Sequence, residues 1–153
     1  MGRMYAAVFE EVAATAAQDL FELVAPSTGV VLVHSIHISQ SSDAGDAASE
    51  MLNILVHRGT ATGTGGSSVT PSPLAVGDSA FGGTCEANNT TQSAEGTFLG
   101  AYNFNIMAGL DIVFTPETRP VISPSGLFIV ELQTTPADSL TMSGTLIFEE
   151  LGT

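Results

Sequence analysis

Several stretches of this chain alternate between apolar and polar side chains, and this two-residue period restricts the fold more than any other feature. Over residues 141–150, Met142, Leu146 and Phe148 would lie on one side of an extended chain, and mainly polar residues would lie on the other. Residues 127–134 alternate in the same way. A strand with one buried face produces this pattern, and it needs partner strands to cover that face. The pattern therefore predicts an all-β protein.

Runs rich in β-branched and aromatic residues, bounded by Gly, Pro, Ser and Asp, predict the strands. Ala108-Gly109 is interpreted as a hairpin turn that joins two of these runs. The N-terminal third has two interpretations, because an alanine-rich helix over residues 11–21 competes with two strands. We favour the strands, since Val, Phe and Leu cluster at both ends of this region. The expected strands cover residues 5–12, 18–25, 30–39, 51–58, 98–107, 110–114, 127–134 and 141–150.

Turns at this spacing are typical of a sandwich or barrel. We predict one antiparallel β-sandwich, jelly-roll-like in character, over residues 1–153, a length that suits one domain. A short helical turn is expected over residues 43–50. Residues 59–79 hold five glycines and two prolines and are predicted to form a long irregular loop. That loop is either a surface tip or an arm that orders against a partner.

The charge is one-sided, with 16 acidic residues against three arginines, no lysine and a net charge of −13. Nucleic-acid binding requires clustered basic side chains, and anionic lipid would repel this chain, so neither partner is expected. A protein partner with a basic surface is favoured. Charged residues make up only 12% of the chain, about half the usual share of a soluble domain. This scarcity favours a surface that neighbouring subunits cover.

Catalytic and cofactor motifs are missing from the sequence. The glycine-rich segment near residue 63 cannot be a phosphate-binding loop of the P-loop type, which requires a lysine. No serine lies in a G-x-S-x-G motif, and Cys85 has no recognisable motif around it. We therefore expect no enzyme activity, no catalytic residue, no cofactor and no small-molecule substrate.

The three histidines are the candidate ligands for a metal site. His34 and His37 are three residues apart on one expected strand, so they should point to opposite faces. His57 with Cys85 or a carboxylate is the remaining alternative, but closed zinc sites usually have four ligands. No metal site is predicted. The acidic residues Asp43, Asp46 and Glu50 lack calcium-loop spacing and are interpreted as a solvated turn.

Cysteine content and hydropathy bear on location. With Cys85 as its single cysteine, the chain has no intrachain disulfide, which favours a reducing cytoplasm during assembly. No apolar run is long enough for a membrane span, and the first residues do not lead into a signal-peptide core.

The opening MGRMYAAVF and the later stretches ISQSSD and PADSLTMSG resemble small virion proteins of tailed bacteriophages. The resemblance covers nearly the whole chain as an overall pattern and contains no catalytic signature. It implies a head decoration (cement) protein, a β-rich homotrimer on the capsid surface, with the major capsid protein as partner. Assembly in the host bacterial cytoplasm would follow.

Two other function classes remain open: a fibre, spike or tail component that binds a receptor, and a hydrolase with a deep polar pocket. A decoration protein needs an edge strand, an arm or a loop that locks onto the shell. The N-terminal segment and the glycine-rich loop are the candidates. The predicted partner-contact residues are Met1, Arg3, Tyr5, Gly63, Gly65, Pro71 and Pro73.

Overall fold

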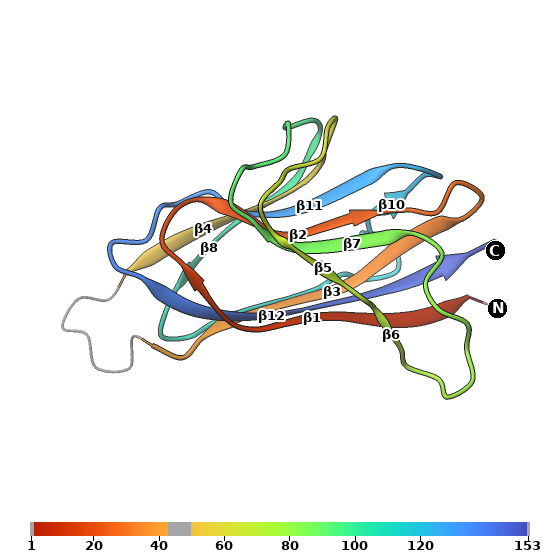
Figure 1. Ribbon diagram of the computed structural model, residues 1–153, viewed down its shortest axis with the longest axis horizontal. Helices are drawn as coiled ribbons and strands as arrows, with labels where there is room; N and C mark the ends of the chain where they lie inside the picture. Colours follow the sequence, from red (N-terminus) through yellow and green to blue (C-terminus); the bar gives the residue numbers. More distant parts are fainter. Residues whose placement is uncertain (1, 43–49, 153) are drawn as a thin grey trace.

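The computed structural model describes residues 2–42 and 50–152, and it shows two antiparallel sheets packed face to face (Figure 1). The predicted β-sandwich is confirmed. Met1 and most of the expected helical turn, residues 43–49, lie outside the described residues. No described helix is long and apolar enough to cross a membrane. The strands are β1 (Arg3–Ala14), β2 (Gln18–Val24), β3 (Val30–Gln40), β4 (Met51–Arg58), β5 (Ser67–Val69), β6 (Ser72–Pro73), β7 (Thr84–Asn89), β8 (Phe98–Asn105), β9 (Leu110–Val113), β10 (Val121–Ile122), β11 (Leu127–Leu132) and β12 (Leu140–Leu151).

The first and last long strands lie side by side in the middle of one sheet, here called sheet A. Its order is β10-β3-β12-β1-β6, and β9 also pairs with β3. Strands β1 and β12 pair from Arg3↔Glu150 to Ala14↔Leu140, so both described ends of the chain reach the same end of the molecule (Figure 1). The two N-terminal strands favoured over a helix are confirmed as β1 and β2.

The second sheet, sheet B, has the order β5-β7-β2-β11-β4-β8. The core fills the space between the sheets, and the expected alternation places it. In β12, Met142, Leu146 and Phe148 are buried while the intervening residues are half-buried. One end of the core is aromatic: Phe148 stacks on Tyr5 with ring centroids 5.6 Å apart and meets Phe81 edge-on at 4.9 Å. Aromatic packing of this kind stabilises the sandwich beyond the area it buries.

The predicted hairpin at Ala108-Gly109 is wrong. Strand β8 pairs with β4 in sheet B, whereas β9 pairs with β3 in sheet A, so the turn carries the chain from one sheet to the other. Gly109 does adopt a left-handed φ of 70°, as a tight turn requires. The local sequence specifies the turn, but the partner of each strand is decided by distant residues.

The predicted irregular loop over residues 59–79 is also corrected, because it contains β5 and β6. Its first part, residues 59–66, pairs with residues 90–97 through bridges at Ala61↔Ala94 and Thr64↔Thr91. These two paired segments are here called the flap. Strand β7, which leads into the second segment, was not predicted, because its short TCEANN sequence reads as polar loop.

Candidate functional site

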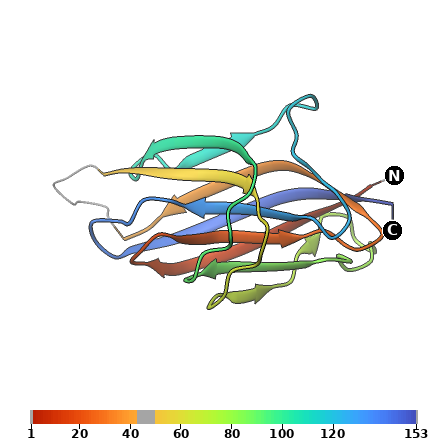
Figure 2. The same cartoon turned by 90° about the horizontal axis from the view of Figure 1, so that it is seen from above.

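The flap crosses the outer face of sheet B. Seen from above, both segments run across β11 and β2 rather than along them (Figure 2). They are joined to each other by four backbone hydrogen bonds of 2.9–3.0 Å, two between residues 64 and 91 and the others from Thr60 N–H to Ala94 O and from Ala94 N–H to Ala61 O. The flap therefore excludes water from the part of the sheet beneath it.

Four titratable side chains lie buried beneath the flap. Asp19 and His57 are 0% exposed, Glu131 is 2% exposed and Glu22 is 3% exposed. They come from three neighbouring strands, β2, β11 and β4, and the register places Asp19 opposite Glu131. We call these four residues the carboxylate cluster. Ionisable groups are rarely buried to this degree without specific partners.

The flap backbone supplies partners for two of the carboxylates. The Gly63 N–H donates to Glu22 Oε2 at 2.7 Å, and the Ser93 N–H donates to Asp19 Oδ2 at 2.6 Å. Asn89 Nδ2 also donates to Glu22 Oε2, at 3.2 Å. Hydrogen bonds to an ionised acceptor are short and roughly twice as strong as neutral ones. Each of the two flap segments is thus anchored to sheet B by a buried carboxylate.

Glu131 bonds to His57, the only basic side chain of the cluster. Its Oε2 lies 2.9 Å from His57 Nε2, and its Oε1 accepts a hydrogen bond of 2.6 Å from Gln92 of the flap. When His57 carries a proton, the pair is a buried salt bridge with both carboxylate oxygens occupied. Removing one partner of such a pair is costly, because an uncompensated charge then stays buried.

Burial shifts the proton affinity of the cluster. Desolvation raises the pKa of Asp19 above its usual range, and it does so against the opposing hydrogen bond from Ser93. The pKa of Glu22 is raised by the same cause, against the bond from Gly63. For His57, burial is the largest single effect and lowers the pKa, but the bonds to Glu131 and to the Arg58 carbonyl, together with the charges of Glu131 and Asp19, outweigh it and the net pKa is raised. All three groups bind their protons more tightly than they would in water.

The flap can approach the cluster only because residue 63 has no side chain. A Cβ there would lie 2.5 Å from the Thr91 carbonyl oxygen and 3.0 Å from Asp19 Oδ2. We expect Gly63→Ala to cost about 2 kcal/mol of unfolding free energy, the usual cost of overpacking a tight contact. Chemical denaturation measures this loss. Thr62→Ala, at the exposed neighbouring position, is the matched control and should change stability by less than about 0.5 kcal/mol; equal effects in both variants would contradict the close-contact explanation.

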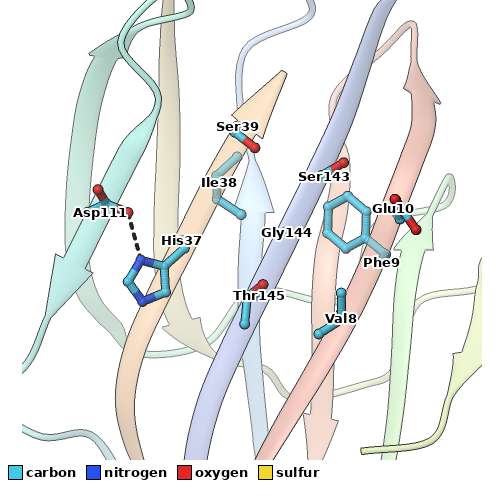
Figure 3. Close-up of a pocket in the computed structure, with 10 residues that line it drawn as sticks. All are labelled: Val8, Phe9, Glu10, His37, Ile38, Ser39, Asp111, Ser143, Gly144 and Thr145. Atoms are coloured by element: carbon cyan, nitrogen blue, oxygen red, sulfur yellow. Dashed lines mark hydrogen bonds and ion pairs between the residues drawn. The ribbon is translucent and has the colours of Figure 1, made fainter. Parts of the chain in front are cut away.

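The outer face of sheet A carries a second polar arrangement beside a shallow hollow of about 510 Å³ (Figure 3). His37 Nδ1 lies 2.6 Å from Asp111 Oδ1, and His37 Nε2 lies 3.0 Å from Ser35 Oγ. These atoms match the order of a serine–histidine–aspartate relay. However, Ser35 is only 8% exposed, and β3 is paired on both sides along this stretch. Backbone N–H groups committed to those ladders cannot serve as oxyanion donors.

The prediction that His34 and His37 point to opposite faces is wrong. The register of β3 on β12 skips His34, since Val33 faces Phe148 and Ser35 faces Ile147. This bulge shifts the alternation by one residue, so His34 bonds to Glu149 Oε2 at 3.1 Å on the same outer face that carries His37. Among the described residues, no group of three or more His, Cys, Asp or Glu side chains could hold a metal ion.

Cys85 and His57 do not meet. Cys85 lies on the core side of β7 within the hydrophobic cluster, whereas His57 lies beneath the flap on the other side of sheet B. Burial raises the pKa of the Cys85 thiol to about 12, so the thiolate is scarce at neutral pH. The alternative of a joint His57–Cys85 metal site is therefore not supported by the geometry.

The predicted partner-contact residues occupy different environments. Arg3 is half-buried, Tyr5 is a fully buried core residue, and Gly63 and Pro71 are buried by the protein's own fold. Gly65 and Pro73 are exposed, the first in the flap and the second on the edge strand β6. Contact with a partner stays a prediction for all of them, and the exposed pair is the better placed.

The edge strand β8 carries no charged side chain, a feature that the sequence prediction missed. No charged residue occurs between Glu95 and Asp111. Phe98 and Leu99 on β8 are 53% and 36% exposed, and Val113 on β9 is 73% exposed. Beside this edge, residues of β8 and β9 line a groove of about 510 Å³ that contains one charged side chain, Asp111. The other lining residues are Leu99, Tyr102, Leu110, Ile112 and Val113, together with Phe114 and Thr118.

Comparison with protein-family models, with curated proteins and with solved structures finds no match for this chain.

The carboxylate cluster was not predicted from the sequence, because each of its acidic residues is isolated there. A usable signal was present: Glu22 and Glu131 each interrupt a run of apolar strand residues, LFELV and FIVEL. An acid within a fully apolar strand indicates a buried polar contact, although not its partner.

Proposed function

We propose that this protein is a structural component of a tailed-bacteriophage virion, a head decoration protein that works by packing against other subunits. The virion resemblance of the sequence supports this proposal. So does a sandwich whose most unusual polar groups are buried and occupied in holding its own flap. Copies of the chain would form a homotrimer that sits on the major capsid protein.

The uncharged edge at β8 is the observation that carries the proposal. An edge strand presents unpaired N–H and C=O groups, and proteins that remain monomeric protect such edges with charged side chains, especially lysine. Here the edge is eight residues long and carries apolar side chains without any charge. Strand addition or apolar packing by a neighbouring subunit would cover it.

Charge indicates which subunit could meet this edge. Two copies of a chain with a net charge of −13 repel each other unless they meet where carboxylates are absent. The stretch between Glu95 and Asp111 is such a place, so we assign it to contacts between copies. Exposed carboxylates such as Glu10, Glu11 and Asp138 would remain free to face a basic capsid surface.

A lysine on this edge strand tests the proposal. We expect Leu99→Lys to convert the trimer to monomers and to lower its association with decoration-free shells by about tenfold or more, because a charge is placed in a desolvated contact. Native mass spectrometry and co-sedimentation measure the two effects. Ser68→Lys, on the exposed opposite edge strand β5 of the same sheet, is the control and should leave both unchanged. A wild-type protein that is monomeric and does not bind shells would contradict the proposal, whereas localisation at a tail tip would favour the receptor-binding alternative.

One observation favours a second candidate function, ester hydrolysis by Ser35, His37 and Asp111. The atom order and the distances suit a proton relay, while the low exposure of Ser35 opposes it. A fluorophosphonate probe distinguishes the two functions. Labelling of Ser35 that His37→Ala abolishes would support hydrolysis, and an unlabelled protein would remove it.

A further inference from the structure

We propose that the carboxylate cluster is a proton-dependent latch, which holds the flap on sheet B firmly in mild acid and releases it as the pH rises. The inference does not rest on the proposed function. It concerns Asp19, Glu22, His57 and Glu131, which anchor both flap segments and are at most 3% exposed.

The cluster has too little positive charge to be fully ionised at low cost. Three carboxylates face one imidazole, and His57 is bonded directly to only one of them. Arg58 follows His57 in the chain, but its guanidinium donates to the Val121 carbonyl oxygen at 3.3 Å. Uncompensated charge in a buried site favours the protonated form of the carboxyl groups.

An unpartnered atom shows where a proton is best placed. Asp19 Oδ1 and the nearby Ser93 Oγ are both buried without a hydrogen bond of good geometry, although the Ser93 hydroxyl lies close enough to the carboxyl group to oppose part of the rise in its pKa. Ser93 itself belongs to the flap, and its N–H already bonds to Asp19 Oδ2 at 2.6 Å. A carboxylate oxygen without a donor is costly to bury, whereas a neutral carboxyl group is much less so.

Of the other charged groups near the cluster, Glu86 also disfavours ionisation of Glu22, and Glu95 lies in solvent. Glu86 on β7 accepts a bond from Asn89 Nδ2 at 3.2 Å, and its negative charge adds to the raised pKa of Glu22. Glu95, on the flap, is exposed. The groups facing the cluster from β2, β4, β7, β11 and the flap thus add negative charge, with His57 as the counter-ion.

The direction of the pH effect follows from linkage. The pKa values of Asp19, Glu22 and His57 are all raised in the closed protein, and opening the flap to water returns each toward its usual value. Opening therefore releases protons, so it is favoured as the pH rises from the usual carboxyl range, through neutrality, past the raised pKa of His57. The same sign applies to unfolding, so these groups stabilise the fold in mild acid and lose that contribution at alkaline pH.

Hydrogen exchange of the anchoring amides tests the latch. We expect the opening equilibrium at the Gly63 and Ser93 N–H groups, after correction for intrinsic exchange, to increase by about tenfold or more between pH 5.5 and pH 8.5. The thermal midpoint should fall over the same range, which is opposite to ordinary acid denaturation. Equal protection at both pH values, or tighter closure at pH 8.5, would overturn the proposal.

Two single-residue variants isolate the responsible group. Asp19→Asn keeps an oxygen for the Ser93 N–H and places an uncharged amide where Oδ1 stands, so it should remove a large part of the pH dependence. Glu95→Gln removes an exposed carboxylate from the same flap and should keep the full dependence. If Asp19→Asn fails to fold, Glu22→Gln provides the same comparison at the Gly63 anchor. A pH dependence that survives both cluster variants would contradict the assignment.

Discussion

His57→Leu is expected to lower the unfolding free energy by about 3 kcal/mol at neutral pH. The substitution leaves Glu131 buried beneath the flap with Gln92 as its remaining bonded partner, and an unpaired buried charge is among the most destabilising defects known. Urea denaturation measures the loss.

Two comparison variants distinguish the loss of the His57–Glu131 ion pair from the general effect of replacing a histidine. His34→Leu removes a similar bond to Glu149, but both of those side chains are 20% exposed, so we expect a loss below about 1 kcal/mol. In the double variant His57→Leu/Glu131→Met no charge stays behind, and most of the stability should return. A double variant as unstable as the single one would show that packing, rather than charge, explains the loss.

Phe148→Ala is expected to cost about 3–5 kcal/mol, the largest effect of any single substitution proposed here. Phe148 is fully buried in β12 and joins the rings of Tyr5 and Phe81 at one end of the core. Its loss removes transfer free energy and leaves a cavity between the two sheets. Calorimetric unfolding measures the effect as a lower midpoint and a lower unfolding free energy.

Phe98→Ala is the matched aromatic control. Its ring is 53% exposed on the edge strand β8, so we expect a stability loss of less than about 1 kcal/mol. The same variant should weaken contacts between copies if β8 is the covered edge. A comparable loss of stability in the two variants would mean that the β8 edge belongs to the core of the single chain.

The candidate site shows how much of a buried polar cluster local sequence patterns can predict. The glycine-rich segment around Gly63 was recognised as unusual, but its purpose depends on Glu22 and Asp19, some 40 residues away in the chain. Nothing in the spacing of these residues indicates that they meet. Conversely, the alternation rule misplaced His37 relative to His34, because a one-residue bulge at His34 reverses the faces that follow it.

The two-residue alternation and the turn residues by themselves determined the all-β class and the position of the long strands. They suffice because burial of one strand face depends only on the local period. The partner of each strand, the crossing at Gly109 from sheet B to sheet A, and the burial of the carboxylate cluster were decided only by the tertiary structure. Each of these depends on contacts between residues far apart in the chain. The local sequence does not indicate which distant groups will be buried together.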